Sequence, residues 1–308
     1  MKVAITGAGG MLGRDLAEEA DRVHHEIAAF TREELDVTDY DAVLRAFERE
    51  LPAVVVNCAA WTDVDGAETH EEQAFAVNAD GAGNVAAAAA QIGARVIQIS
   101  TDYVFNGEKR EAYVESDPVA ALGVYGRSKL AGEDQVVANN PRHLIVRTSW
   151  LYGTSGKNFV ETMLALAEEQ NEILVVADQF GCPTWSRELA RAIVDLLDFE
   201  RLGVMHVCGD GITTWYDFAR EIFRQAQVEV NVLSGVTAML DRPAPRPVNS
   251  AMVSEREDAP KLQRWDHGLH GYLLERAHRS GAEEQPLESR PEDQPHEEQA
   301  PEEQGEMS

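Results

Sequence analysis

The chain has 308 residues, and its 44% hydrophobic and 26% charged residues are typical of folded water-soluble domains. It carries 27 basic and 54 acidic residues, and a net charge of −27 disfavours polyanions, so we expect neither nucleic acid nor a membrane as a partner. No apolar stretch reaches the roughly 20 residues of a membrane span, and residues 1–7 lack the apolar core of a signal peptide. We therefore expect a cytoplasmic location, in which Cys58, Cys182 and Cys208 stay reduced.

The charge is unevenly distributed along the chain. Residues 280–308 contain ten acidic residues, one arginine and four prolines, so their composition favours a disordered acidic tail over a functional acidic arm. The rest of the chain is acidic too, and 22 of the 27 basic residues are arginines. Concentrated salt screens such a surface, so we expect a halophilic protein adapted to a salty cytoplasm, with an ordinary acidic enzyme as the alternative.

Strands and helices alternate through the first half of the chain. Short apolar runs predict strands at residues 2–6, 27–30, 53–57, 95–100 and 143–148. Helical patterns lie between them at residues 11–20, 41–51, 74–92 and 124–139. This alternation predicts an α/β fold with a Rossmann-type, doubly wound and mostly parallel sheet.

The pattern loosens after Trp150. The later elements are helices at residues 159–170, 187–197 and 215–227, strands at 173–176 and 204–207, and a rigid loop at Pro243, Pro245 and Pro247. They predict a smaller C-terminal α/β domain. We therefore expect an NAD(P)-binding domain over residues 1–150 and a mainly substrate-binding domain over 151–279, with some segments returning to the first sheet.

A glycine-rich turn over residues 7–13 joins the first predicted strand to the first helix. Gly7, Gly10 and Gly13 permit a tight turn, the close approach of a pyrophosphate and helix packing, and free amides at the helix start favour phosphate. The alternative is a purely structural turn. The strand–helix alternation that follows favours a dinucleotide, which we expect Gly7 and Gly10 to contact.

The second predicted strand ends at Phe30, Thr31 and Arg32, without the acid that binds the ribose in NAD-dependent proteins. Thr31 and Arg32 can instead hold a 2′-phosphate, which favours NADPH, with NADH as the alternative. The neighbouring Glu33 and Glu34 weigh against this assignment, because they favour an Arg32 side chain that is simply solvated.

Tyr125 and Lys129 lie four residues apart on a predicted helix and therefore share one face. A free phenol has a pKa of about 10, and a nearby ammonium lowers it, so the pair can donate a proton during carbonyl reduction. Thr101 follows a predicted strand, at the sheet edge where ligands bind, and its hydroxyl can polarise a substrate oxygen. The alternatives are a chance spacing for the pair and a structural turn at Thr101.

Eight segments together resemble the dTDP-4-dehydrorhamnose reductase family of extended short-chain dehydrogenases/reductases. They follow in order at residues 6–13, 57–65, 78–79, 100–105, 125–129, 147–150, 178–184 and 246–250. The glycine turn and the Tyr–Lys pair belong to the whole superfamily. Far more specific are S-T-D-Y-V-F at 100–105, R-T-S-W at 147–150 and D-Q-F-G-C-P-T at 178–184. The resemblance runs from the start of the chain to about residue 271.

This resemblance implies a reductase of a nucleotide sugar. NADPH, or NADH, would deliver a hydride to C4 of dTDP-4-dehydro-β-L-rhamnose and give dTDP-L-rhamnose. Tyr125 would donate the proton to O4, Lys129 would bond the nicotinamide ribose and lower the Tyr125 pKa, and Thr101 would align the reacting oxygen. The implied cofactor contacts are Gly10, Met11, Leu12, Asp36, Val37, Ala59, Ala60 and Thr62. The implied substrate contacts are Asp102, Tyr103 and Trp150.

The substrate's diphosphate requires local cations, and Arg242 and Arg246 in the proline-rich loop are candidates, with a simple surface loop as the alternative. Phe30 stands where some relatives have an acid, which supports NADPH. Some relatives hold Mg²⁺ between subunits through glutamates, but here the first helix has Asp15, and Arg187 occupies a second ligand position. We therefore name no metal ligand and leave Mg²⁺ and a homodimer open.

Neighbouring activities can be compared at the same positions. Related dehydratases use a Thr-Asp-Glu sequence, and Tyr103 replaces that glutamate here, which weighs against dehydration. Another nucleotide-sugar reductase or an epimerase stays an alternative, although related epimerases usually lack the Asp-Tyr-Val-Phe run. A non-enzymatic alternative is a subunit resembling the β subunit of methionine adenosyltransferase, which has this fold and binds NADP. The presence of Thr101, Tyr125 and Lys129 together favours an enzyme.

Overall fold

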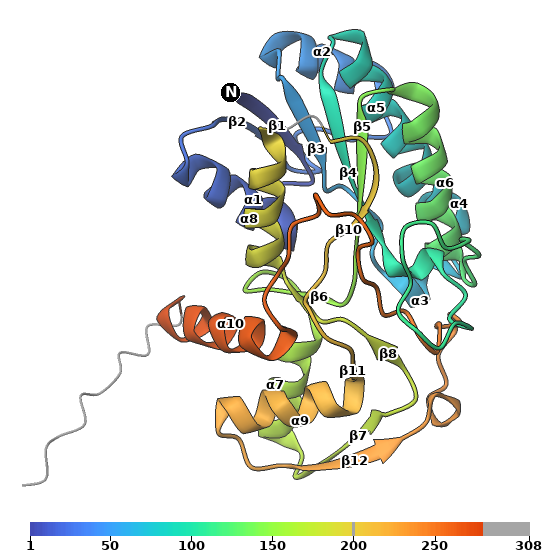
Figure 1. Ribbon diagram of the computed structural model, residues 1–308, viewed down its shortest axis with the longest axis vertical. Helices are drawn as coiled ribbons and strands as arrows, with labels where there is room; N and C mark the ends of the chain where they lie inside the picture. Colours follow the sequence, from blue (N-terminus) through green and yellow to red (C-terminus); the bar gives the residue numbers. More distant parts are fainter. Residues whose placement is uncertain (199–200, 280–308) are drawn as a thin grey trace, which may run out of the picture.

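A six-stranded parallel sheet lies at the centre of the upper half of the molecule in Figure 1. The computed structural model describes residues 1–198 and 201–279. The strand order is β10-β5-β4-β3-β1-β2, and every neighbouring pair is parallel. The strands are β1 (Lys2–Thr6), β2 (Glu26–Phe30), β3 (Val54–Asn57), β4 (Arg95–Thr101), β5 (His143–Thr148) and β10 (Gly203–His206). This sheet confirms the predicted Rossmann-type α/β fold.

Helices cover both faces of this sheet. Because successive strand residues point to opposite faces, Val3 and Ile5 of β1 pack into one core cluster and Ala4 into another. The first cluster lies under α1 and α8, and the second lies under α2, α5 and α6. The bounds of these helices are α1 (Met11–Arg22), α2 (Tyr40–Glu50), α5 (Gly81–Gln91), α6 (Val124–Asn139) and α8 (Ser186–Leu197).

The prediction of one helix over residues 74–92 is wrong. The structure has α4 (Glu71–Phe75), then a π-helical turn over Ala76–Asp80, and only then α5. Within that turn, the Asn78 amide accepts from Trp61 N at 2.8 Å and donates to Ser128 Oγ at 2.9 Å. The widened turn therefore lets one buried side chain tie the segment after β3 to α6, and π-helical turns are frequent at functional sites.

The lower half of the molecule is built from the second half of the chain (Figure 1). Its core contains Tyr152, Phe218 and Tyr272, which pack between three helices. The helices are α7 (Phe159–Glu169), α9 (Trp215–Ala226) and α10 (Trp265–Arg279). Three two-stranded sheets accompany them: β7 (Glu172–Val176) with β12 (Asn231–Gly235), β6 (Leu151–Tyr152) with β9 (Thr184–Trp185), and β8 (Phe180–Gly181) with β11 (Thr213–Thr214).

The two halves of the chain are interleaved. The segment predicted as a strand at 204–207 joins the large sheet as β10, next to β5, and α8 packs beside α1. The prediction placed no element over α10 or β12, because neither has a strong apolar period. The division into two domains at residue 150 stays a prediction.

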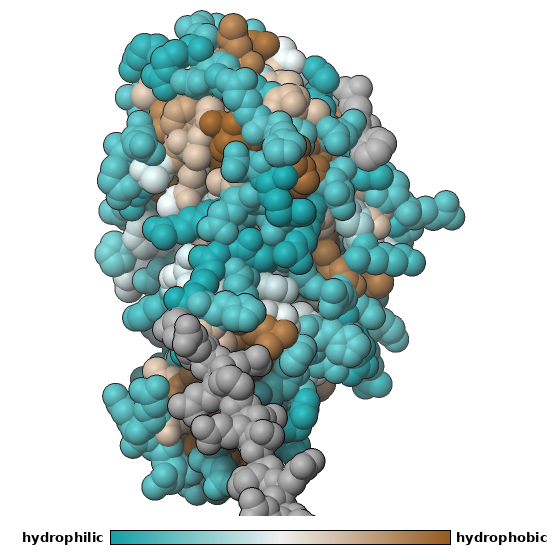
Figure 2. Space-filling view, turned by 90° about the vertical axis from the view of Figure 1, so that its left-hand side faces the viewer, coloured by the Kyte–Doolittle hydropathy of each residue, from teal (hydrophilic) through white to brown (hydrophobic). Residues whose placement is uncertain are grey.

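The surface agrees with the acidic composition. The face shown in Figure 2 is mostly hydrophilic, with small and separate apolar patches. Within residues 1–198 and 201–279, no helix is long and apolar enough to cross a membrane. The predicted acidic tail at 280–308 lies outside the described residues.

Candidate active site

The glycine turn brings three chain segments into contact. Gly7 has a φ of +69°, and a Cβ there would lie 2.6 Å from Ala59 N, so only glycine fits both the conformation and the space. A Cβ at Gly13 would lie 2.4 Å from the Gly7 carbonyl oxygen, so α1 packs directly on the turn. Gly10 is the N-cap of α1 and provides no side-chain cap. Its first-turn amides, at Met11 and Leu12, suit the pyrophosphate of a dinucleotide.

The tip of β2 lies beside this turn. A Cβ at Gly9 would lie 3.6 Å from the Thr31 methyl carbon, and Arg32 next to Thr31 is exposed to solvent. The Glu34 carboxylate also lies at this tip, where it accepts from Thr31 N at 2.8 Å. The binding of a 2′-phosphate by Thr31 and Arg32 stays a prediction.

The remaining predicted cofactor contacts surround the same turn. Asp36 is exposed and accepts from Thr38 N at 3.0 Å, and this hydrogen bond holds the pKa of its carboxyl below the usual value. Val37 is buried against the start of α5, where a Cβ at Gly81 would lie 2.8 Å from it. The segment carrying Ala59, Ala60 and Thr62 continues β3 past the glycine turn. The structure therefore brings these residues to one edge of the sheet.

Thr101 and Tyr125 come together at the carboxyl end of β4. Thr101 is the last residue of β4, and Tyr125 lies in the first turn of α6. The Thr101 hydroxyl lies close enough to the Tyr125 phenol to lower its pKa. A Cβ at Gly126 would lie 2.3 Å from the Tyr103 carbonyl oxygen, so α6 begins directly on the turn after β4. The Tyr103 ring packs edge-on against Tyr125 at 5.5 Å between centroids.

Lys129 lies one turn further along α6 and is buried. Its ammonium donates to the Ile99 carbonyl at 2.7 Å, and burial lowers its pKa to about 8. The expectation that Lys129 lowers the Tyr125 pKa is not met here: burial raises that pKa to about 12, the nearby Asp102 raises it further, and the Thr101 hydroxyl opposes them. Desolvation therefore dominates this pKa, and Tyr125 keeps its proton at neutral pH.

Asp102 is a further buried ionisable group in this cleft. Thr101 Oγ1 donates to Asp102 Oδ1 at 3.0 Å, and no hydrogen bond within the described residues reaches Asp102 Oδ2, although the Ser250 hydroxyl lies nearby. Burial raises the pKa of Asp102 to about 6. A buried carboxyl oxygen without a partner is costly in a folded protein, and its position beside Thr101 suits a contact with substrate.

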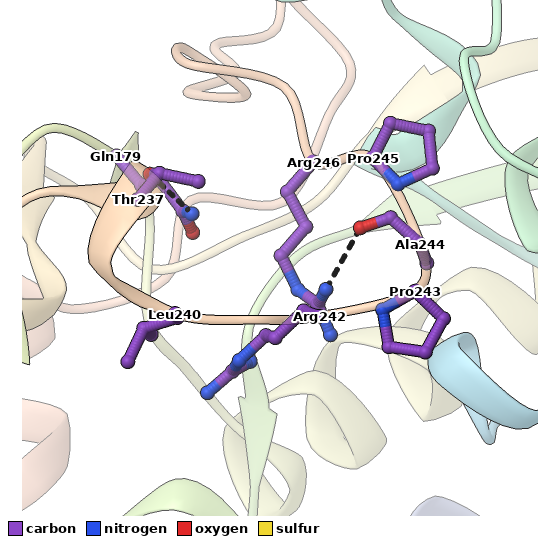
Figure 3. Close-up of a pocket in the computed structure, with 8 residues that line it drawn as sticks. All are labelled: Gln179, Thr237, Leu240, Arg242, Pro243, Ala244, Pro245 and Arg246. Carbon is purple, nitrogen blue, oxygen red and sulfur yellow. Dashed lines mark hydrogen bonds between the residues drawn. The ribbon is translucent and has the colours of Figure 1, made fainter.

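The proline-rich loop closes the substrate side of the cleft. Arg246 donates to both Asp65 oxygens, at 3.0 and 2.8 Å, and to the Ala244 carbonyl at 2.9 Å. Figure 3 shows its side chain lying across the loop, whereas Arg242 extends away from it. These residues border a pocket of about 300 Å³, lined by Gln179, Thr237, Leu240, Arg242, Pro243, Ala244, Pro245 and Arg246. Arg246 is thus neutralised by Asp65, and Arg242 is the exposed cation of the pocket.

Several residues at this site were not singled out from the sequence. Asp65 lies inside the segment 57–65 that carries the family resemblance, but only the fold pairs it with Arg246. Glu68 accepts from Val124 N at 2.8 Å and so caps the helix that carries Tyr125. Trp215 stacks on Trp150, with 3.5 Å between ring centroids. Each of these contacts joins residues more than 50 positions apart, so no local pattern announces them.

A separate cluster of charges joins α1, α8 and α10. Arg187 forms ion pairs with Asp15 at 3.1 Å, Glu18 at 2.6 Å, Glu19 at 3.1 Å and Glu275 at 2.8 Å. Its guanidinium supplies the positive charge among these carboxylates. A divalent cation would have to displace it, so this cluster does not fit Mg²⁺.

Comparison with known proteins agrees with this geometry. The family model described as the RmlD substrate binding domain matches residues 1–277. The chain is 39% identical over 278 residues to the spore coat polysaccharide biosynthesis protein SpsK of Bacillus subtilis, covering 90% of this chain and 98% of that protein. It is 42% identical over 262 residues to a dTDP-4-dehydrorhamnose reductase of Mycobacterium tuberculosis, covering 83% of this chain and 86% of that protein.

Solved structures give the same result. The dTDP-4-dehydrorhamnose reductase of Bacillus anthracis in complex with NADP has a TM-score of 0.87 and 40% identity, covering 89% of this chain and 99% of that chain. The Clostridium acetobutylicum dTDP-4-dehydrorhamnose reductase has a TM-score of 0.87 and 42% identity over the same shares. The chain therefore belongs to the RmlD family, together with the dTDP-4-dehydrorhamnose reductases.

Proposed function

We propose that this protein reduces the C4 ketone of dTDP-4-dehydro-β-L-rhamnose to dTDP-L-rhamnose with NADPH. The observation that carries the proposal is that Thr101 and Tyr125 lie close together, with Lys129 one turn away, at the same sheet edge as the glycine turn. The dTDP-4-dehydrorhamnose reductase of Bacillus anthracis, 40% identical, was solved with NADP. The exposed Arg32 and the absence of an acid at Phe30 favour NADPH over NADH.

The bound cofactor supplies the hydride. Tyr125, whose pKa of about 12 keeps its hydroxyl protonated, donates its proton to the carbonyl oxygen as negative charge develops there. Thr101, whose hydroxyl lies beside this phenol, would orient it toward the carbonyl oxygen. Lys129, which now donates to the Ile99 carbonyl, would hold a ribose hydroxyl of the cofactor, and its ammonium would stabilise the phenolate left after proton transfer.

The substrate side follows from the chemistry of the cleft. A nucleoside diphosphate carries negative charge, and Arg242 is the exposed cation of the pocket beside the proline-rich loop. Asp102 and Tyr103 directly follow β4, Trp150 follows β5 at the same sheet edge, and all three would bind the sugar. Arg246 would act through the shape of the loop, because Asp65 already holds its guanidinium.

The proposal is tested with the purified protein, NADPH and enzymatically made dTDP-4-dehydrorhamnose. We expect the reduced nicotinamide absorbance to fall and dTDP-rhamnose to form in equal amounts. Replacing NADPH by NADH, and dTDP by UDP, measures the two preferences separately. No oxidation with any dTDP-4-keto-6-deoxy sugar, together with tight NADPH binding, would contradict the proposal and favour a binding subunit.

A second candidate substrate should be tested in the same assay. A relative from Streptomyces niveus that is 43% identical, covering 71% of this chain and 77% of that protein, is described as a dTDP-4-keto-6-deoxy-D-glucose reductase. That sugar carries the same ketone and differs in configuration at other ring carbons. The ratio of kcat/KM for the two sugars decides between them.

We also propose that the protein works in a salty cytoplasm and without Mg²⁺. The excess of acidic residues supports the first statement, and the position of Arg187 supports the second. A titration with KCl should raise the midpoint of thermal unfolding strongly up to molar salt. A chelator should leave activity unchanged. A homodimer, which light scattering would detect, would need a surface other than the cluster around Arg187.

A further inference from the structure

Trp150 has a backbone conformation that is unusual for its size. Its φ is +46°, in the left-handed region that glycine and asparagine favour. Such a conformation persists only when the surrounding structure holds it, and it occurs often at ligand-binding positions. The neighbours of Trp150 therefore show what fixes it.

Two contacts hold the Trp150 ring. The Trp215 ring stacks on it, with 3.5 Å between centroids and 5° between planes. The backbone at Gly181 lies against the same ring, because a Cβ there would come within 2.2 Å of Trp150 Cε2. No larger residue at 181 would leave the ring in place.

Trp215 is itself firmly held. It is the first residue of α9, whose N-cap Thr214 accepts from Asp217 N at 3.0 Å. Phe159 of α7 packs against the Trp215 ring at 4.5 Å between centroids. Through this stack, α9 in the lower half of the molecule fixes the position of the Trp150 ring at the edge of the large sheet.

Trp150 lies at the same edge of the large sheet as Thr101. It follows β5 by two residues, and Thr148 of β5 pairs in register with Thr101 of β4. Its side chain is half-buried, which leaves part of the indole accessible. An accessible part of an indole at this sheet edge offers an apolar surface for the C–H face of a hexose ring.

We infer that Trp215 is a positioning residue for the nucleotide sugar: by stacking on Trp150 it holds that residue in the left-handed conformation that presents its indole to the hexose. The inference rests on the proposed function, because it takes the hexose as the ligand. It assigns to α9 a role in sugar binding and none in binding the cofactor.

The test compares three variants. Trp215→Leu removes the stack, Trp215→Phe keeps a flat ring, and Trp265→Leu is the matched control. Trp265 also begins a helix and contacts Phe218 in the same core, at 5.7 Å between centroids, but it is not stacked on Trp150. We expect Trp215→Leu to raise KM for the dTDP-sugar about tenfold and to leave KM for NADPH unchanged, while Trp215→Phe recovers most of the loss.

A spectroscopic readout separates positioning from general stability. Two stacked indoles couple their transitions and give a far-ultraviolet circular dichroism couplet. We expect the couplet in the wild type and in Trp265→Leu, and its loss in both Trp215 variants and in Trp150→Leu.

Several outcomes would overturn the inference. The first is a wild type without the couplet, and the second is a Trp215→Leu variant whose KM for the dTDP-sugar is unchanged. The third is an equal rise of KM for the sugar and for NADPH in both Trp215→Leu and Trp265→Leu. A wild type that oxidises no NADPH with any dTDP-4-keto-6-deoxy sugar would refute the proposed function, and this inference with it. In that case the couplet would still show whether the stack exists.

Discussion

Two regions of this protein bury charge in opposite ways. In the cluster around Arg187, one guanidinium with only 12% of its side chain exposed is paired with four carboxylates from α1 and α10. Burial raises the pKa of Asp15 in this cluster, but at Glu18 and Glu19 hydrogen bonds from arginines outweigh burial and lower the pKa. In the cleft, burial alone dominates: it raises the pKa of Asp102 and Tyr125 and lowers that of Lys129.

The difference shows which buried charges serve stability and which serve chemistry. A buried ion that is fully paired holds elements together, and removing one partner is costly. A buried ionisable group without a counter-ion is destabilising, and such groups gather where a ligand completes their contacts. By this criterion the Arg187 cluster is structural and the Thr101–Tyr125 cleft is functional.

The largest effect should come from removing the Tyr125 hydroxyl. Tyr125→Phe deletes the proton donor and leaves the ring packed against Tyr103. We expect kcat to fall by about 10²–10⁴-fold while NADPH binding, measured by calorimetry, stays within about twofold. Tyr113→Phe is a control, since Tyr113 is buried elsewhere and bonds Asn106. Undiminished kcat in Tyr125→Phe would contradict the assignment.

The structural role assigned to the Arg187 cluster is tested by removing its central guanidinium. Arg187→Ala leaves Asp15, Glu19 and Glu275 without their shared cation, so we expect the free energy of unfolding in urea to fall by about 3–5 kcal/mol. Activity of the folded fraction should be unchanged. Arg191 is the matched control, because its side chain is 50% exposed, pairs with one carboxylate of the cluster, Glu19, and otherwise lies over the Trp185 ring; its alanine variant should lose less than about 1 kcal/mol.

At Asp102 we expect the opposite effect of a substitution, a gain in stability. Its pKa is about 6 in the folded protein against an ordinary 3.8, so the folded state binds the proton more tightly than the unfolded state. The protonated carboxyl therefore adds to the free energy of unfolding. This stabilisation is complete below about pH 4 and is lost as the pH rises through 6. Asp102→Asn never ionises. At pH 8 we therefore expect the variant to be more stable than wild type by about 2–3 kcal/mol, yet less active. Equal stability of the two proteins at pH 8, measured in urea, would contradict this account.

The smallest effect is expected at the loop. Asp65→Asn frees Arg246, whose side chain is 8% exposed, and loosens the loop at Ala244. We expect KM for the dTDP-sugar to rise about tenfold with little change in KM for NADPH. Glu71→Gln is the control, because Glu71 forms an exposed ion pair with Arg127 of α6. An unchanged sugar KM in Asp65→Asn would show that the loop holds its shape without this pair.

Local patterns predicted the parts of the fold that depend on local burial. β3 is apolar from Val54 to Val56 because helices cover both faces of the sheet, and that signal is visible in the sequence. The π-helical turn after α4 could not be predicted, since it depends on Asn78 reaching both Trp61 and Ser128. The sequence predicted that some segment after residue 150 would return to the large sheet, but not that this segment would be β10.

In the candidate active site, too, local spacing was predictable and contacts between distant segments were not. The spacing of Tyr125 and Lys129 on one helix places both residues in the cleft without further information. Their pKa values depend on desolvation, which the sequence does not show, so the expected lowering of the Tyr125 pKa was wrong. Arg246 was expected to meet the substrate, and its pairing with Asp65, 181 residues away, became visible only in the structure.

The most direct measurement follows the hydride itself. NADPH carrying deuterium at C4 of the nicotinamide, prepared as each of its two stereoisomers, is incubated with the wild-type protein and dTDP-4-dehydrorhamnose. The account predicts that one stereoisomer places deuterium at C4 of the sugar, with one NADPH consumed for each dTDP-rhamnose formed. A product without deuterium from either stereoisomer, or no consumption of NADPH, would contradict it.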